Sequence, residues 1–174
     1  MNTIKLVVLG DDYVGKTSII NQYVHNRYIE NAYISIGINI FIKNITINDK
    51  KIIIWDTPGI ERFRNRALVF LKGANIVLLV YDITSQRSFK ELNDWIQHVN
   101  KIVNKEEVII GIAANKYDLY ERQEVIKEEG EQFAKENNFL FYETSGKDYE
   151  SVKRVFEGLV KAYLEQIEKK EKAF

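Results

Sequence analysis

Residues 10–17 read GDDYVGKT, which matches the pattern GxxxxGK(S/T). The apolar run at 4–9 precedes this segment and helical spacing follows it at 18–24, so the order is strand, loop, helix. In such a loop the glycines let backbone N–H groups close on a phosphate, and the helix N-terminus adds a positive dipole. The segment therefore predicts a phosphate-binding loop, in which Lys16 reaches the β/γ oxygens and the Thr17 hydroxyl ligates Mg²⁺.

Apolar runs of strand length recur along the chain, with helical stretches between them. They lie at residues 4–9, 52–55, 76–81, 108–113 and 139–142. Continuous Val and Ile runs suit strands that are buried on both faces. The alternation predicts an α/β fold with a doubly wound, mostly parallel sheet, helices on both faces and ligands beyond the carboxyl ends of the strands.

Two helices and one edge hairpin have signals of their own. Ile36, Ile38, Ile40 and Ile42 alternate with other residues before a turn at 48–50, which predicts an antiparallel hairpin at a sheet edge. Residues 88–91 have the capping-box form and open an amphipathic stretch in which Trp95 faces the core. Residues 152–167 have the apolar spacing of a long docked helix.

Charge and cysteine content exclude several function classes. The 174 residues carry 25 Lys and Arg against 25 Asp and Glu, so bulk charge does not favour nucleic acid as a partner. No cysteine is present, which excludes a disulfide framework, a thiolate zinc site and prenylation of the chain as it stands. With no signal peptide or membrane-spanning run, we expect a cytoplasmic protein.

Two further motifs follow predicted strands. Residues 56–59 read DTPG, and Asp56 at a strand end could hold Mg²⁺ through water. Residues 115–118 read NKYD. A carboxylate at Asp118 can accept the N1–H and the exocyclic amino protons of guanine, which adenine cannot offer, so this motif selects the base.

With these motifs in order, the sequence resembles the Ras superfamily of small GTPases, and most closely the Rab branch. Residues 55–63 are similar to the family's WDTAGQERF, residues 81–84 to its YDIT and residues 143–147 to its ETSAK. The resemblance implies a P-loop GTPase fold, with a six-stranded sheet, GTP or GDP and Mg²⁺. The resemblance covers residues 3 to about 165. The length of the chain and the lack of a linker or repeat predict a single domain over residues 1–174, with a charged helix end at 165–174.

The resemblance assigns site residues motif by motif. Lys16 is the catalytic lysine, and Thr17, Ser35 and Asp56 are the metal ligands. Ser35 either replaces the first-switch threonine or neighbours its deletion. Tyr28 either lies beside the base or packs only. The implied nucleotide-binding residues are Asp12, Tyr13, Val14, Gly15, Lys16, Thr17, Ser18, Tyr28, Ser35, Gly59, Asn115, Lys116, Asp118, Ser145, Gly146 and Lys147.

Departures from the family pattern cluster around the γ-phosphate. Ile60 replaces the glutamine that orients the attacking water, and Ile has neither donor nor acceptor for that task. Asp12 and Tyr13 stand where relatives carry small residues, and Tyr13 either covers the nucleotide or points to solvent. Pro58 fixes φ in the second switch. We therefore expect slow intrinsic hydrolysis.

The sequence predicts a Rab-like molecular switch in vesicle trafficking; the alternative is a GTP-locked scaffold with negligible hydrolysis. A P-loop kinase is a weaker rival, because no Arg-rich lid is visible. The partners implied are an exchange factor, a GTPase activator and effectors, which contact a monomer through residues 30–45 and 57–72, with Trp55 in the aromatic patch. Either the chain is cut short of a prenylated tail that would make it peripheral on endomembranes, or it works without a lipid anchor.

Overall fold

The computed structural model describes residues 3–28, 37–45, 50–59 and 69–173. Within them, six strands form one sheet in the order β2-β3-β1-β4-β5-β6. Neighbouring strands are parallel except β2 and β3, which are antiparallel. The strands are β1 (Thr3–Leu9), β2 (Asn39–Asn44), β3 (Lys51–Asp56), β4 (Ile76–Asp82), β5 (Ile109–Asn115) and β6 (Leu140–Thr144). The predicted fold class, including the antiparallel edge hairpin, is confirmed.

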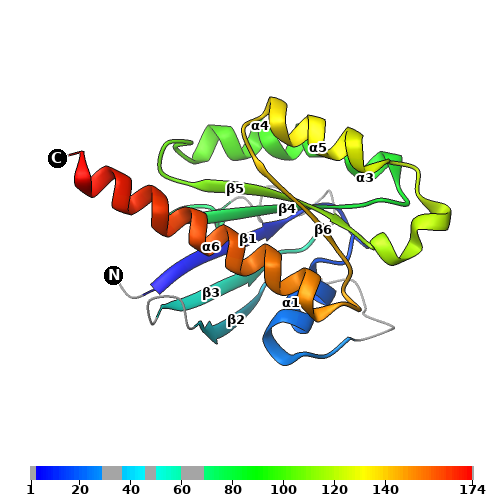
Figure 1. Cartoon of the computed structure of the whole chain (residues 1–174), viewed down its shortest axis with the longest axis horizontal. Helices are drawn as coiled ribbons and strands as arrows, with labels where there is room; N and C mark the ends of the chain where they lie inside the picture. Colours follow the sequence, from blue (N-terminus) through cyan, green and yellow to red (C-terminus); the bar gives the residue numbers. More distant parts are fainter. Residues whose placement is uncertain (1–2, 29–36, 46–49, 60–68, 174) are drawn as a thin grey trace.

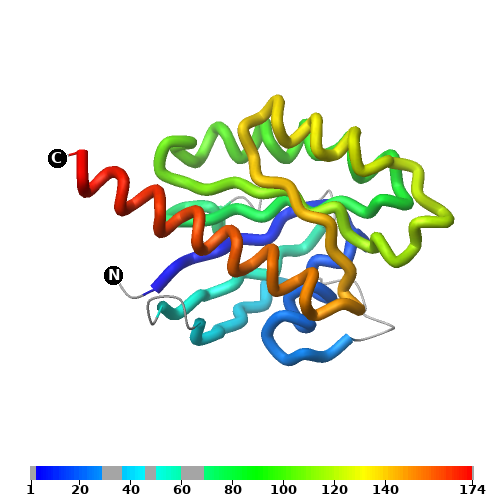
Figure 2. Tube along the Cα trace, viewed as in Figure 1, coloured from blue at the N-terminus to red at the C-terminus, as the bar shows by residue number. Residues whose placement is uncertain are grey.

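Helices cover both faces of this sheet (Figure 1). They are α1 (Lys16–His25), α3 (Gln86–Lys90), α4 (Leu92–Ile102), α5 (Lys127–Glu136) and α6 (Tyr149–Lys172). One core cluster lies between the sheet and α4 and α5, and a second lies between the sheet and α1 and α6. Figure 2 shows α1, in blue, beside the start of α6, in orange, although more than a hundred residues separate them in the sequence. The central strand β4 is buried along its whole length and β1 and β5 nearly so, as their composition predicts, whereas the run at 139–142 lies on the edge strand β6 and is only partly buried.

The edge strand β2 orients its side chains in a way that the alternation alone did not settle. Phe41 packs on the α1 side of the sheet, whereas Ile40 and Ile42 are 53% and 55% exposed. The cross-strand neighbours of Ile40 and Ile42 are Trp55 and Ile53. The apolar side chains of β2 therefore divide between the core and the surface.

The helical segment after β4 begins earlier than the capping box predicts. Ser85 caps α3, and its Oγ accepts a hydrogen bond from the Ser88 backbone N–H. Ser88 lies inside α3, where its own Oγ donates to the Ser85 carbonyl and accepts from the Asp82 backbone N–H. The prediction of Ser88 as the cap was wrong, because its hydroxyl accepts a hydrogen bond from the backbone N–H of Asp82 at the end of β4 instead.

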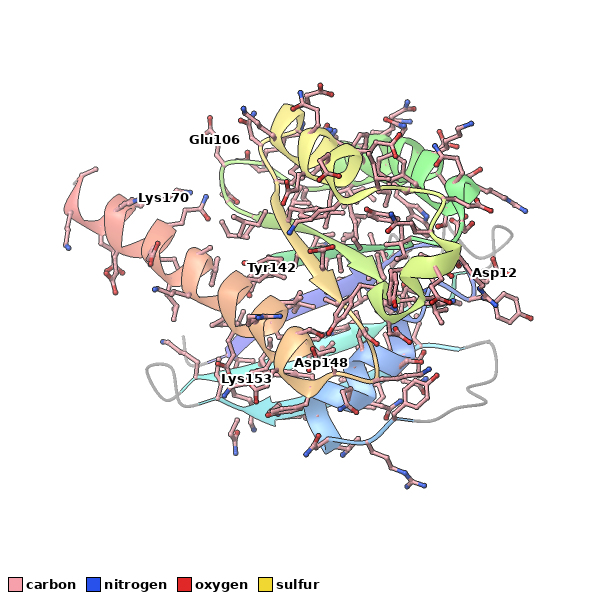
Figure 3. All side chains as sticks on the ribbon, turned by 45° about the vertical axis from the view of Figure 1, so that its right-hand side comes forward. Asp12, Glu106, Tyr142, Asp148, Lys153 and Lys170 are labelled. Atoms are coloured by element: carbon pink, nitrogen blue, oxygen red, sulfur yellow. The ribbon has the colours of Figure 1, made fainter. Side chains whose placement is uncertain are left out.

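The long helix α6 extends through Lys172, beyond its last buried apolar residues. Near this end, Gln166 and Lys170 donate hydrogen bonds to the Glu106 carbonyl in the loop before β5. Figure 3 shows Glu106 and Lys170 together at the end of the molecule that is remote from Asp12. In the described part of the chain, no helix has the length and apolar character to cross a membrane.

Candidate functional site

The predicted site segments converge at one edge of the sheet. Because β1, β3, β4, β5 and β6 are mutually parallel, their carboxyl ends lie together. The phosphate loop follows β1, and the DTPG segment, the NKYD segment and residues 143–147 begin at the last residues of β3, β5 and β6. Figure 3 shows Asp12 at this edge. Ser35 and Ile60 lie outside the described residues, so their predicted roles stay predictions.

The phosphate loop has a backbone that few residues other than glycine can adopt. Gly10 and Gly15 have φ of 144° and 95°. A Cβ on Gly10 would lie 2.3 Å from the Val80 carbonyl oxygen, and one on Gly15 would lie 2.3 Å from Asn115 Nδ2. Tyr13 also has a positive φ, of 59°, and its side chain is 67% exposed. Because left-handed backbone costs a non-glycine residue about 1–2 kcal/mol, Tyr13 strains the loop in a way that glycine would not. The exposed side chain is compatible with both alternatives, covering a bound nucleotide or pointing to solvent, so its role stays a prediction.

Lys16 is the buried cation of this loop. Its Nζ donates hydrogen bonds to the carbonyl oxygens of Gly10 at 2.9 Å and Asp11 at 2.6 Å. Burial lowers the pKa of Lys16 to about 8, and the carboxylates of Asp56, Asp11 and Asp12 partly oppose that shift. A polyphosphate bound against the loop would add negative charge and favour the ammonium form. The lysine is thus held within the loop that is predicted to bind phosphate.

Two oxygen ligands of the predicted metal site lie side by side. Thr17 Oγ1 donates a hydrogen bond of 2.6 Å to Asp56 Oδ2, which joins the start of α1 to the end of β3. A hydroxyl and a carboxylate are the hard oxygen donors that Mg²⁺ takes, usually with only one or two carboxylates and substrate phosphates. The described residues contain no cluster of three or more His, Cys, Asp or Glu side chains that could hold a metal without such phosphates. The pair therefore fits Mg²⁺ bound together with a nucleotide.

The DTPG segment packs directly on the phosphate loop. Thr57 Oγ1 donates to the Val8 carbonyl at 2.7 Å, and residues 56–59 are all buried. A Cβ on Gly59 would lie 2.3 Å from both the Asp11 carbonyl carbon and the Asp12 nitrogen. Glycine at this position therefore lets the second switch approach the backbone of the phosphate loop.

The side chains of Asn115 and Lys116 hold the phosphate loop from the other side. Asn115 Nδ2 donates to the Val14 carbonyl at 2.7 Å, and Lys116 Nζ donates to the Tyr13 carbonyl at 2.7 Å. Lys116 Nζ also lies 2.5 Å from the Asp82 carboxylate at the end of β4. The two residues that the motif assigns to the base thus also brace the loop that is predicted to bind phosphate.

Asp118, the residue predicted to choose guanine, is held by two side chains from the loop after β6. Ser145 Oγ donates to Asp118 Oδ1 at 2.6 Å, and Lys147 Nζ lies 3.3 Å from Asp118 Oδ2. Lys147 Nζ also lies 5.5 Å from the centroid of the Tyr28 ring. Tyr28 is therefore next to the predicted base pocket rather than in the core, which favours the first of its two alternatives.

A cavity of about 70 Å³ lies between these residues. It brings together the predicted base-side residues and adds Leu119. Its lining consists of Gly15, Ser18, Tyr28, Asn115, Lys116, Asp118, Leu119, Ser145, Gly146 and Lys147. Glycine at position 146 lets this loop pack closely on α1, because a Cβ there would lie only 3.1 Å from Ser18 Cβ.

Sequence reasoning missed the partner of Trp95. This indole is fully buried, as predicted, and its Nε1 donates a hydrogen bond of 2.9 Å to Asp11 Oδ1 of the phosphate loop. Asp11 is only 8% exposed. The sequence shows an Asp in the phosphate loop and a tryptophan in an amphipathic helix, but nothing in it indicates that the two residues form a pair.

An apolar patch lies on the surface beside the second switch. It comprises the exposed side chains of Ile40 and Ile42 and the partly buried Trp55, which lie at the β2–β3 edge of the same sheet face on which α4 and α5 pack. Trp55 stacks on Phe70 with ring centroids 5.2 Å apart, and Lys5 Nζ lies 4.6 Å above the indole. Exposed apolar groups gathered in this way are typical of protein-binding surfaces.

Comparison with known proteins gives a family. The sequence matches the Ras family over residues 5–165. It is 39% identical to "Ras-related protein RabQ" from Dictyostelium discoideum over 166 residues, which are 94% of this chain and 81% of that protein. It is 36% identical to "Ras-related protein Rab-18" from Caenorhabditis elegans over 167 residues, which are 95% of this chain and 82% of that protein. Together with the six-stranded sheet and its strand-end motifs, this similarity shows that the chain belongs to the Ras family of small GTPases, as a Rab-like member.

Proposed function

We propose that this protein binds GTP and GDP together with Mg²⁺, selects guanine through Asp118 and hydrolyses GTP slowly as a switch in vesicle trafficking. The observation that carries the proposal is the bond of 2.7 Å from Asn115 Nδ2 to the Val14 carbonyl. It joins a base-selecting motif to a phosphate loop, so that one ligand with a guanine base and phosphates spans both.

The chain's own groups supply positioning and charge. Lys16 and the loop N–H groups stabilise negative charge on the phosphoryl oxygens, and the Gly59 N–H contacts the γ-phosphate. Thr17, Ser35 and Asp56 would hold Mg²⁺, which when bound neutralises phosphate charge. The contact of Gly59 with the Asp11–Asp12 peptide supports this role, because the second switch begins where the γ-phosphate would lie.

Slow turnover follows from two substitutions. Ile60 cannot orient the attacking water, since its side chain has no polar atom. Asp12 is exposed and adjoins Gly59, so its carboxylate adds negative charge beside the place where negative charge develops in the transition state. Turnover at a useful rate would then need a partner that supplies the missing groups.

The second candidate, a GTP-locked scaffold, rests on the same two residues. This candidate differs from the first only in the rate of GTP hydrolysis, which would be negligible both with and without a Rab-directed activator. Effector binding is common to both candidates, and we assign it to the apolar patch of Ile40, Ile42 and Trp55, where the exposed β2 side chains support a protein contact.

The test is chromatography of the nucleotide bound to the purified protein, followed by single-turnover phosphate release from bound GTP. We expect guanine nucleotide and a slow rate that Ile60→Gln raises by at least about tenfold, while Ile60→Leu, the matched apolar control, leaves it unchanged. Adenine nucleotide would overturn the assignment of the base. Release at a rate typical of glutamine-containing relatives would refute slow turnover, and no release with an activator would favour the scaffold.

A further inference from the structure

Tyr117, the variable residue of the NKYD segment, is bonded to a loop that follows a different strand. Its hydroxyl donates a hydrogen bond of 2.5 Å to Asp148 Oδ2. The ring packs against the apolar core cluster beneath α4 and α5, which fixes the direction of the hydroxyl. The bond raises the pKa of Tyr117 and lowers the pKa of Asp148. Both shifts favour a neutral hydroxyl donating to a carboxylate, which is among the stronger hydrogen bonds in proteins.

Asp148 also begins α6. Its Oδ1 accepts a hydrogen bond of 3.0 Å from the Glu150 backbone N–H, so one carboxylate caps the helix with one oxygen and receives Tyr117 with the other. Figure 3 shows Asp148 at the start of this helix. The helix is long and its first turns are buried in the core, so the anchor to which Tyr117 is bonded is rigid.

The same two loops are joined a second time at the adjacent residue. Ser145 Oγ donates to Asp118 at 2.6 Å, and the Asp148 backbone N–H donates to the Ser145 carbonyl at 2.9 Å. Tyr117 and Asp118 are neighbours in the chain, so these bonds close a ring that runs from Tyr117 through Asp148 and Ser145 to Asp118. The ring therefore restrains Asp118 from two directions, through its own bond to Ser145 and through the bond of its neighbour Tyr117 to Asp148. This restraint adds to the ion pair between Lys147 Nζ and Asp118 Oδ2, which lie 3.3 Å apart.

We propose that Tyr117 is a positioning residue for guanine recognition, which locks Asp118 in place through Asp148 and thereby slows release of the nucleotide. This inference rests on the proposed function of the site. Since Asp118 must meet two protons of the base at once, a looser carboxylate lowers affinity and also discrimination between guanine and hypoxanthine, which lacks the exocyclic amino group.

The test compares Tyr117→Phe, Asp148→Ser and the double variant with the unaltered protein, each loaded with a fluorescent GDP analogue and chased with excess GDP. Serine keeps the helix cap but is too short to receive the tyrosine hydroxyl. We expect each single variant to release GDP about five- to tenfold faster, because each loses the same hydrogen bond to a charged carboxylate. The double variant should be no faster than either single variant, since it loses no further bond between these residues. The ratio of the affinity for GDP to the affinity for IDP should also fall in each variant.

Tyr163→Phe is the matched control. Tyr163 lies in α6, and its hydroxyl accepts a hydrogen bond of 2.7 Å from Asn75, far from the site. Removing this hydroxyl should leave the rate of GDP release unchanged. Release from Tyr117→Phe at the unaltered rate, additive effects in the double variant, an unchanged preference for GDP over IDP, or equal acceleration by Tyr163→Phe would each overturn the inference. Failure of the unaltered protein to bind GDP would instead refute the proposed function itself.

Discussion

Replacing Trp95 with Phe tests whether the phosphate loop is fastened to α4. The indole of Trp95 is fully buried, and its Nε1 donates to Asp11 Oδ1 at 2.9 Å. Phenylalanine keeps the apolar ring in the core but has no N–H, so it removes the donor and leaves a void where part of the indole was.

Two terms set the size of the effect. A buried hydrogen bond to a carboxylate contributes about 1.5–3 kcal/mol, and we take the lower end because Asp11 has other interactions. The lost ring atoms and the cavity cost about 1–2 kcal/mol more. The free energy of unfolding should therefore fall by about 3 kcal/mol, which for a domain of this length lowers Tm by about 6–12 °C.

Urea unfolding followed by circular dichroism measures this loss. Trp55→Phe is the matched control, because Trp55 is partly exposed and stacks on Phe70 rather than lying within the core. It should cost about 1 kcal/mol or less. If the two variants lose equal stability, or if Trp95→Phe loses less than about 1 kcal/mol, the fastening of the loop through Asp11 is not what stabilises this region.

Three further perturbations test other parts of the site. Gly59→Ala places a Cβ 2.3 Å from the Asp11–Asp12 peptide, so we expect about 2 kcal/mol of lost stability in urea unfolding and weaker GTP binding, whereas Gly37→Ala, with no atom within 4 Å, should do neither. Tyr13→Gly relieves a φ of 59° and should raise Tm by the equivalent of up to about 1 kcal/mol; a lower Tm would show that the ring packs usefully. Asp148→Ser should weaken the loss of stability at acid pH, because the folded pKa of Asp148 is lowered and its contribution to stability is present near neutral pH and lost as the pH falls through that pKa. Thermal unfolding between neutral pH and about pH 3 measures how Tm depends on pH. If the variant and the unaltered protein show the same dependence, the bond to Tyr117 contributes nothing.

Local patterns were enough for the fold class. The Val and Ile runs predicted the strands to within about two residues, because burial on both faces allows only apolar side chains at consecutive positions. The phosphate loop was identifiable because its glycines are required by positive φ and by contacts at 2.3 Å that no Cβ tolerates. Ser88 was misassigned because its hydroxyl has several local partners, and the sequence does not say which it takes.

The sequence by itself determined the order of the strands and helices along the chain and the identity of the motif residues, since these depend on neighbours in the chain. It also showed that the residue at position 60, Ile60, has no polar side chain. Only the tertiary structure decided that Trp95 meets Asp11, 84 residues away, that Asn115 holds Val14, 101 residues away, and that Tyr117 reaches Asp148. Those bonds join loops that the parallel sheet brings to one edge, and which side chains pair there depends on register and on distances of a few ångströms, which periodicity along a single chain does not encode.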